Sequence, residues 1–308
     1  MKTVLITGAH GFIGRNCARY FSRNGCRVIG IGHGTWKGAE LKEAGIESWV
    51  EASITFEALD AIDGHIATII HCAGSGSVAY SLAEPMLDFQ RTVDSTLAVL
   101  EFIRRSANPI NLVYPSSAAV YGLNNSLPTK ENSTTAPISP YGVHKKIAEE
   151  LCVSYASSFG VETAIIRFFS IYGAGLKKQL LWDACRKISG TVDDNVCFFG
   201  SGNETRDWLH VDDAAALILA VSEQKMEPLS IINGGTGVST PVRDILQTIA
   251  DAFGNNSRIQ FNGEVRTGDP MYYEADISLA TRLGWSPRVH VKAGIREYVE
   301  WFRNLALP

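Results

Sequence analysis

The sequence has no excess of basic charge and no long apolar run. Lys and Arg total 28 against 32 Asp and Glu, so the formal net charge is −4, and the basic residues form no stripe along the chain. We therefore expect no nucleic-acid partner, because such a partner requires clustered positive charge. The longest apolar run, at 214–221, is far too short to cross a bilayer, so we expect no membrane partner either.

Cysteine spacing offers neither a metal site nor a redox motif. The six cysteines show no C-x-x-C and no zinc-ligand spacing, and they stand at Cys17, Cys26, Cys72, Cys152, Cys185 and Cys197. We therefore expect no bound metal. The opening residues, MKTVLITGAHGFIG, enter a strand pattern without a secretory signal, so we expect a cytoplasmic protein with reduced thiols.

Short apolar runs alternate with helical stretches over residues 1–170. Runs of strand length lie at 3–7, 27–31, 68–72, 111–115 and 163–168, and stretches with helical spacing lie at 13–24, 85–107 and 141–159. This order predicts an α/β fold built from βαβ units. We expect a Rossmann-type, doubly wound parallel sheet with helices on both faces.

The pattern becomes less regular after Gly173, where clusters of Gly, Asn and Thr replace the alternation. We interpret this part as a smaller, irregular α/β lobe that binds substrate and is interleaved with strands returning to the main sheet. The expected division assigns residues 1–172 and about 208–232 to the Rossmann domain. Residues of about 173–207 and 233–308 form the second lobe in this prediction.

A glycine-rich loop joins the first expected strand to the first expected helix. Its spacing is G-x-x-G-x-x-G, at Gly8, Gly11 and Gly14. Gly8 suits a tight turn, Gly11 lets the backbone approach a pyrophosphate, and Gly14 lets helix and strand pack closely. The amides at the helix N-terminus would hold the anion, because the helix dipole favours negative charge there. The loop predicts a dinucleotide cofactor, against the alternative of an ordinary strand–helix turn.

The second expected strand ends at Gly32, without the Asp or Glu that commonly bonds the ribose 2′-hydroxyl of NAD. A carboxylate there would repel a 2′-phosphate, so its absence permits NADP. His33, Arg15 and Lys37 could supply hydrogen-bond donors or charge to that phosphate. We predict NADP as the preferred cofactor, and NAD held by backbone contacts is the alternative.

Three residues form a predicted catalytic group. Ser139 and Pro140 suit the start of a helix, on which Tyr141 and Lys145 share one face at a spacing of four. An ammonium near a phenol lowers the phenol pKa from its usual value of about 10, which would let Tyr141 exchange a proton near neutral pH. Ser117 follows the end of a strand, where ligands bind in open α/β sheets. We therefore predict that Ser117, Tyr141 and Lys145 are catalytic.

Together these motifs resemble the extended short-chain dehydrogenases/reductases, the NAD(P)-dependent epimerase/dehydratase family that acts on nucleotide sugars. The resemblance runs nearly from end to end, through motifs at 7–14, 71–74, 116–122, 141–145, 167–173, 200–213, 266–269 and 283–285. Four residues depart from the family pattern, since Asn, Asp, Asn and Ser are common at the positions of Thr92, Ser53, Ser170 and His144. The helices expected at 85–107 and 141–159 pair subunits in this family, which implies a homodimer.

The resemblance also implies roles for individual residues. Ser117 and Tyr141 would bond the sugar oxygen at the reacting carbon, and Lys145 would bind the nicotinamide ribose. The implied cofactor-binding residues are Gly8, Gly11, Phe12, Ile13, Gly14, His33, Ser53, Ile54, Cys72, Ala73, Gly74, Thr92, Tyr141, Lys145, Phe168 and Ser170. The implied residues for a nucleotide-diphosphate sugar are Ser75, Ser117, Ser170, Leu180, Phe198, Arg206, Arg266 and Asp269.

Arg206 and Arg266 would clamp the diphosphate of that sugar, and Asp269 would lie near its ribose. Arginine suits this role because its guanidinium offers paired donors to phosphate oxygens. The alternative for each arginine is a surface salt bridge to the neighbouring Asp207 or Asp269.

The two residues after Ser117 narrow the reaction. Family dehydratases carry an Asp–Glu pair there, and decarboxylases carry Glu at the second position, whereas this chain has Ala118 and Ala119. A methyl group is neither an acid nor a base, so we exclude a 4,6-dehydratase and disfavour a decarboxylase.

Two reactions at the hexose C4 remain. We favour an NADPH-dependent 4-keto-6-deoxyhexose reductase, because Gly32 replaces the acid that NAD enzymes carry. The alternative is a nucleotide-sugar 4-epimerase of the UDP-glucose or UDP-GlcNAc type. A non-catalytic NADP-sensing regulator fits less well, because such proteins typically lack the active-site tyrosine.

Overall fold

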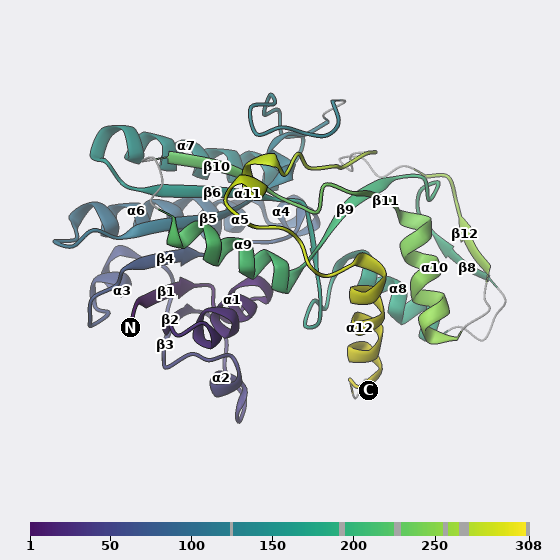
Figure 1. Cartoon of the computed structure of the whole chain (residues 1–308), viewed down its shortest axis with the longest axis horizontal. Coiled ribbons are helices and arrows are strands. Elements are labelled where there is room, and N and C mark those ends of the chain that lie inside the picture. The colour runs from purple at the N-terminus through teal and green to yellow at the C-terminus, as the bar shows by residue number, and fades with distance from the viewer. Residues whose placement is uncertain (124–125, 191–194, 225–228, 255–257, 265–270, 306–308) are drawn as a thin grey trace.

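A seven-stranded parallel sheet organises the chain in the computed structural model, which describes residues 1–123, 126–190, 195–224, 229–254, 258–264 and 271–305 (Figure 1). The strand order is β10-β6-β5-β4-β1-β2-β3, and all neighbouring strands are parallel. The strands are β1 (Thr3–Thr7), β2 (Arg27–Gly32), β3 (Ser48–Glu51), β4 (Thr68–His71), β5 (Asn111–Ser117), β6 (Thr163–Phe168) and β10 (Leu229–Gly234). The order reverses between β1 and β4, as in a Rossmann-type fold, which confirms the predicted fold class.

Helices cover both faces of this sheet, which explains the continuous apolar runs of its strands. Helices α1 (Phe12–Arg23) and α9 (Val211–Glu223) pack on one face, and α3 (Phe56–Asp60), α6 (Ser95–Arg105) and α7 (Pro140–Phe159) pack on the other. Within β1, Val4 and Ile6 join the first core, on the face covered by α1 and α9, and Leu5 joins the core on the opposite face. The alternation follows from the two-residue period of a strand.

The stretch predicted as one helix at 85–107 is divided into three. Helix α5 (Pro85–Phe89) continues into a π-helical turn, η1 (Gln90–Asp94), before α6 begins. Such turns are rare and often occur at functional sites. Here the turn contains Thr92, one of the predicted cofactor-binding residues.

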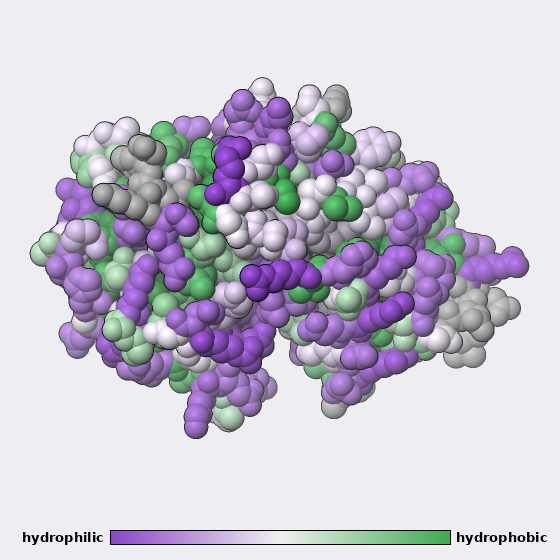
Figure 2. Space-filling view, viewed as in Figure 1, coloured by the Kyte–Doolittle hydropathy of each residue, from purple (hydrophilic) through white to green (hydrophobic). Residues whose placement is uncertain are grey.

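The second part of the chain has its own small sheets and core. Strands β7 (Ser170–Tyr172), β9 (Thr205–His210) and β11 (Ser239–Pro241) form one sheet, and β8 (Asn195–Phe198) pairs with β12 (Arg258–Phe261). Helices α8 (Gln179–Ser189), α10 (Val242–Phe253) and α12 (Val291–Arg303) enclose a separate hydrophobic cluster, the second core. In the space-filling view a notch separates this part from the larger one at the lower edge of the molecule (Figure 2).

The two parts are interleaved along the chain. Strand β10 extends to Gly234 within the large sheet, and Ala280 and Trp285 pack into the core beneath that sheet. The Trp285 indole donates to the Asp213 carbonyl oxygen (3.2 Å). The predicted domain boundary at residues 232 and 233 remains a prediction. Residues 280 and 285, which that prediction assigns to the second lobe, contact the core of the large sheet.

Short elements complete the fold. They are α2 (Glu40–Glu43), α4 (Val78–Ala83), the 3₁₀ turn η2 (Ala118–Val120) and α11 (Ser278–Arg282). Of the helices that the structure describes, none combines the length and the apolar character that a bilayer crossing needs.

Candidate active site

The glycine-rich loop between β1 and α1 has the shape of an anion-binding turn. Gly8 adopts a φ of 66°, and a Cβ on it would lie 2.7 Å from the Ala73 amide nitrogen. A Cβ on Gly14 would lie 2.3 Å from the Gly8 carbonyl oxygen, so both positions exclude side chains. Helix α1 begins at Phe12, directly after Gly11, which has no side chain to bond the first-turn amides. Those amides suit the pyrophosphate of a dinucleotide.

A buried chain of hydrogen bonds ties this loop to the end of β4 and to the turn η1. The Ala73 amide donates to Thr7 Oγ1 (3.1 Å), which lies 2.7 Å from His71 Nδ1. Across the ring, His71 Nε2 lies 3.1 Å from Thr96 Oγ1, which donates to the Thr92 carbonyl oxygen (2.6 Å). Thr96 donates its one hydroxyl proton to the Thr92 carbonyl, so it must accept a hydrogen bond from His71 Nε2. The proton of the His71 ring is therefore assigned to Nε2.

His71 is therefore a neutral link between two segments that carry predicted cofactor-binding residues. Its side chain is fully buried, and burial together with the nearby Lys145 ammonium lowers the pKa of His71 to about 3. The imidazole consequently keeps one tautomer throughout the neutral range.

Two predicted ligand-binding residues present buried hydroxyls. Within the part of the chain that the structure describes, neither Ser75 Oγ nor Thr92 Oγ1 has a hydrogen-bond partner. Leaving a buried hydroxyl unpaired costs roughly 1–3 kcal/mol, so a ligand that bonds it would be stabilised. Gly74 directly precedes Ser75, and a Cβ there would stand 3.3 Å from Thr92 Oγ1. Together with the glycine loop, these hydroxyls fit a dinucleotide lying across the ends of β1 and β4.

The end of β2 brings together two residues predicted for the cofactor's adenosine side. His33 Nε2 lies 3.2 Å from Ser53 Oγ, and both side chains are exposed. The Arg15 guanidinium lies over the Trp36 ring, 5.0 Å from its centroid. Gly32 adopts a φ of 154°, a conformation that residues with a side chain rarely take. A side chain at this position would therefore be strained in this conformation.

The other predicted cofactor residues lie around the same strand ends. Ile13 and Cys72 are partly buried against the first core, and Phe168 lies within it. Phe12 packs against the second core, and Ile54 packs against the core on the opposite face of the sheet. Their contacts with a cofactor remain predictions.

Ser117, Tyr141 and Lys145 meet at the carboxyl edge of the sheet. Ser117 ends β5, and its Oγ accepts a hydrogen bond from the Ala119 amide (3.2 Å). Tyr141 lies in the first turn of α7, near enough to the Ser117 side chain for that side chain to lower the pKa of Tyr141. Lys145 follows one turn later, and its Nζ donates to the Pro115 carbonyl oxygen (2.9 Å). The structure thus brings the three predicted residues together, and their catalytic roles remain predictions.

The predicted effect of Lys145 on the pKa of Tyr141 is wrong for this structure. Burial raises the pKa of Tyr141 above its ordinary value, and the Ser117 hydrogen bond opposes that rise. The Lys145 ammonium is directed at the Pro115 carbonyl and lies 4.6 Å from the centroid of the Tyr114 ring. Burial also lowers the pKa of Lys145, to about 8.

Two serines fix the start of α7. Ser139 Oγ accepts from the Gly142 amide (3.2 Å), as expected of an N-cap residue. Ser81 Oγ, buried in α4, accepts from the Tyr141 amide (3.0 Å) although it lies 60 residues away in sequence. The backbone of Tyr141 is therefore held from a neighbouring helix as well as from its own cap.

A buried ion pair joins α7 to the ends of β5 and β6. Arg167 Nη2 donates to Glu149 Oε2 (2.7 Å), and Ser116 Oγ donates to Glu149 Oε1 (2.5 Å). Arg167 also donates to the Glu131 carbonyl oxygen (2.9 Å). Glu149 lies two turns after Tyr141 on the same helix, so this pair fixes the spacing between Tyr141 and the strand that ends at Ser117.

Several predicted substrate residues lie in the second part of the chain. Arg206, in β9, donates to the Thr205 carbonyl oxygen (2.9 Å), and its guanidinium lies 5.6 Å from the Tyr273 ring centroid. Leu180 packs against the second core, and Phe198 is buried within it. Ser170 begins β7, beside Trp208 of β9. Arg266 and Asp269 lie outside the described residues.

The alternative of an Arg206 salt bridge to Asp207 receives no support. The buried Asp207 carboxylate accepts hydrogen bonds from the amides of Thr236, Gly237 and Ala275, at 2.6, 3.0 and 3.1 Å. It also accepts from the Thr236 hydroxyl (2.7 Å). Asp207 therefore holds two loops in place.

The family model for the NAD dependent epimerase/dehydratase family matches residues 4–235, which include the glycine loop, Ser117, Tyr141 and Lys145. The chain belongs to this family. A putative UDP-glucose 4-epimerase of Methanocaldococcus jannaschii is 32% identical over 313 residues, which cover 98% of each chain.

Solved structures of similar proteins match this member of the epimerase/dehydratase family over nearly its whole length. The UDP-glucose-4-epimerase from Stenotrophomonas maltophila, with bound NAD and formylated UDP-arabinopyranose, has a TM-score of 0.89 at 25% identity over 98% of both chains. The UDP-glucose 4-epimerase from Thermotoga maritima, with UDP-glucose, has a TM-score of 0.88 at 27% identity over 98% of both chains.

Some side chains around Tyr141 in this epimerase/dehydratase family member were not predicted from the sequence. Glu149 continues the spacing of Tyr141 and Lys145 by one further turn, so its place on the same helix face was available as a signal. Ser81 and Asp88 offered no such signal, because each approaches α7 from another element.

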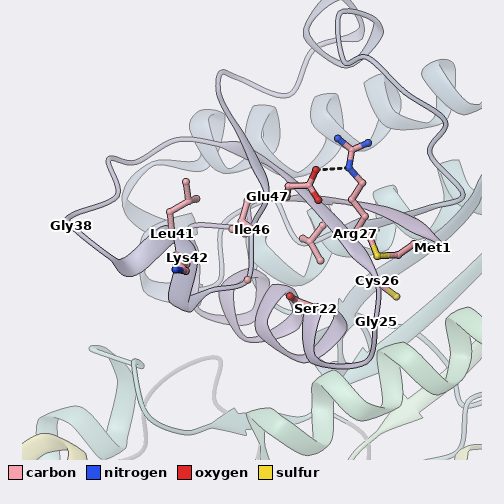
Figure 3. A pocket seen from close by; sticks show the side chains of 12 residues that line it. Met1, Ser22, Gly25, Cys26, Arg27, Gly38, Leu41, Lys42, Ile46 and Glu47 are labelled. Atoms are coloured by element: carbon pink, nitrogen blue, oxygen red, sulfur yellow. Dashed lines mark hydrogen bonds and ion pairs between the residues drawn. The ribbon is translucent and has the colours of Figure 1, made fainter.

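A surface pocket lies at the opposite edge of the sheet (Figure 3). It is formed where β2 begins beside the end of α1 and the short helix α2, and its lining includes Cys26, Lys42 and the Arg27–Glu47 ion pair (2.8 Å). None of the predicted site residues lines it. The carboxyl edge therefore remains the candidate active site of this family member.

Proposed function

We propose that the protein is an NAD-dependent nucleotide-sugar 4-epimerase that acts on a UDP-hexose. The observation that carries this proposal is the meeting of Ser117, Tyr141 and Lys145 at the sheet edge, where two alanines, Ala118 and Ala119, directly follow Ser117. Such a site can exchange a proton at a sugar hydroxyl but has no acid–base pair for eliminating water. The similar UDP-glucose 4-epimerases favour this reading over the 4-keto-6-deoxyhexose reductase expected from the sequence.

The chain's own residues would manage the proton at the sugar C4 oxygen. The phenolate form of Tyr141 would take that proton as the C4 hydroxyl is oxidised, and the resulting phenol would return it when the carbonyl is reduced from the other face. Ser117 bonds the same oxygen and holds it against Tyr141. Lys145 is close enough along the helix face to orient the cofactor's ribose. Bound NAD supplies the hydride acceptor and donor, so one turnover consumes no net cofactor.

NAD is the proposed cofactor, in place of the NADP predicted from Gly32. Arg15, one of the residues expected to meet a 2′-phosphate, already lies over Trp36. The matched family is NAD dependent, and the similar Stenotrophomonas enzyme binds NAD.

A direct assay separates the two reactions. The purified protein is incubated with UDP-glucose, UDP-galactose or UDP-GlcNAc, and the products are separated while nicotinamide absorbance is followed. Interconversion of C4 epimers without net change in NADH supports the epimerase. Stoichiometric NADPH oxidation with a nucleotide 4-keto-6-deoxyhexose, and no epimerisation, would establish the reductase instead. Titration with NAD and NADP in parallel tests the cofactor.

The proposed enzyme works as a homodimer in the cytoplasm. Helices α5 and α7 expose apolar side chains, of which Met86 is 73% exposed and Phe89 and Val143 are 37% and 39% exposed. Burying such side chains against a second copy would favour association. Light scattering on the purified protein tests this, and a monomer at micromolar concentration would contradict it.

A further inference from the structure

An aromatic ring lies against the Lys145 ammonium and takes no part in the proposed reaction. Tyr114, in β5, is fully buried, and the Nζ of Lys145 lies 4.6 Å from the centroid of its ring. Within the part of the chain that the structure describes, the Tyr114 hydroxyl has no hydrogen-bond partner. What Tyr114 offers the site is therefore the face of its ring.

Lys145 is a buried cation, with 6% of its surface exposed. The nearby Asp88 carboxylate is paired with His144. The Glu149 carboxylate, one turn further along α7, is paired with Arg167. Among the described residues, neither carboxylate forms an ion pair with Lys145. Removing an ammonium from water is costly unless its charge is compensated, and the negative face of an aromatic ring attracts a cation within about 6 Å of the centroid.

The ring stabilises this charge without occupying a hydrogen-bond donor. An ammonium has three N–H donors, and Lys145 uses one of them on the Pro115 carbonyl oxygen (2.9 Å). In the described part of the chain, Nζ has no other hydrogen-bond partner. A carboxylate in place of the ring would take one or both of the remaining donors, whereas the ring leaves both for the hydroxyls of a bound ligand.

The ring of Tyr114 is itself held by His71. The two rings stack with their centroids 5.8 Å apart and an angle of 26° between their planes. Because His71 stays neutral, it does not compete with Lys145 for the negative face of the ring. His71 also belongs to the buried chain of hydrogen bonds that starts at the glycine loop, so the stack places the ring and the ammonium at a fixed position relative to that loop.

We propose that Tyr114 is a positioning residue whose ring holds the charged Lys145 ammonium at the sheet edge and leaves two of its N–H donors for the nicotinamide ribose of the cofactor. This inference rests on the proposed function, in which Lys145 orients that ribose. Tyr114 acts through Lys145 and not on the reacting atoms.

The first test changes the charge distribution of the ring and keeps its shape. Tyr114 is replaced by Phe and then by phenylalanine with one, three or five ring fluorines, which progressively withdraw negative charge from the face of the ring. We expect Tyr114→Phe to bind NAD as wild type does, and the fully fluorinated ring to weaken NAD binding by roughly three- to thirty-fold, measured by calorimetric titration. The same fluorinated rings in place of Phe302, which packs against Trp182 and Phe253 in the second core, are the matched control and should leave NAD affinity unchanged.

The second test follows the charge of Lys145 without cofactor or sugar. The Cε resonance of ¹³C-labelled Lys145 is identified by its loss in Lys145→Met and is then followed against pH. A ring that no longer attracts the ammonium should move this titration to lower pH, by roughly half to one unit for the fully fluorinated ring relative to Tyr114→Phe. The other titratable groups around Lys145 are the same in every variant, and they are Asp88 of α5, His71 of β4, Cys72 after β4, and Tyr141, Glu149 and Cys152 of α7.

The two tests separate the role of Tyr114 from the proposed function. An unchanged Lys145 titration across the fluorinated rings would overturn the hold of the ring on the ammonium. A shifted titration with unchanged NAD affinity would overturn the assignment of the free donors to the ribose. Shifts in both, in a protein that turns over no UDP-hexose, would leave the role of Tyr114 standing and refute the epimerase.

A pair of ordinary variants makes the same comparison where the fully fluorinated protein does not fold. Tyr114→Phe keeps the ring and should retain the wild-type Lys145 titration and NAD affinity. Tyr114→Leu keeps an apolar side chain but removes the ring, so it should move the titration to lower pH and weaken NAD binding. Equal titrations in the two variants would overturn the inference.

Discussion

Tyr141 is the residue on which the proposed chemistry depends most directly. Replacing it with Phe removes the hydroxyl but keeps the ring that packs in the first turn of α7. We expect Tyr141→Phe to lower kcat by roughly 10²–10⁴-fold, the usual cost of losing general acid–base catalysis, with NAD binding nearly unchanged. Steady-state kinetics and NAD titration check this. A variant with more than half of the wild-type rate would remove Tyr141 from the mechanism.

We predict that Arg206 binds the substrate's diphosphate. A charge-assisted hydrogen bond contributes roughly 1.5–3 kcal/mol, so Arg206→Ala should weaken UDP binding about ten- to hundred-fold and leave NAD binding unchanged. Isothermal titration with UDP and with NAD measures the two affinities separately. Arg258→Ala, at an exposed position in β12, serves as the control. Loss of NAD binding with intact UDP binding would reverse the assignment of Arg206.

Helix α7 is stabilised against the sheet by a buried ion pair as well as by its apolar face. Glu149→Gln leaves the Arg167 guanidinium without its anionic partner, and the loss of one member of a buried pair costs roughly 3–5 kcal/mol. The exposed neighbour Glu150 is the matched control, and Glu150→Gln should change stability by less than about 0.5 kcal/mol. Urea unfolding of both variants measures the difference. Equal midpoints would mean that the Glu149–Arg167 pair adds nothing to stability.

The elements that the sequence predicts well are those with strong local signals. The strand runs, the glycine loop and the start of α7 each depend on neighbouring residues, and the structure contains all of them. The π-helical turn at Gln90–Asp94 has no local signal in the sequence, so one helix was predicted in its place.

The contacts that tune the site are harder to predict, because they join distant segments. The Asp88–His144 contact spans 56 residues, and the Ser81–Tyr141 contact spans 60. Spacing along one helix reveals neither of them. The predicted pKa of Tyr141 failed for the same reason, since its burial depends on several elements at once.

At the scale of the whole molecule, His71 makes stability depend on pH. Its pKa falls from the usual 6.5 to about 3 in the folded state, so below about pH 6.5 the unfolded chain binds a proton that the folded chain excludes. The neutral buried His71 therefore costs no stability above pH 6.5, and the free energy of unfolding decreases as the pH falls below that value. Between pH 7 and pH 5 the free energy of unfolding should decrease by about 2 kcal/mol through this group.

His71→Gln isolates this contribution from that of the other histidines. The variant carries no titrating group at this position, so its stability should fall less steeply between pH 7 and pH 5, even if it is less stable at pH 7. Urea unfolding at several pH values gives both slopes. Identical slopes for variant and wild type would show that His71 is readily protonated in the folded protein.

Strand β10 joins the large sheet only after the chain has passed through β7, α8, β8, β9 and α9. It pairs with β6 along its whole length, from Leu229 opposite Thr163 to Gly234 opposite Phe168. On the ribosome, β6 therefore emerges well before its outer neighbour exists, and its free backbone groups form an open edge that another nascent chain can extend. We expect this interval of synthesis, more than any weakness of the finished fold, to be when the protein needs a chaperone.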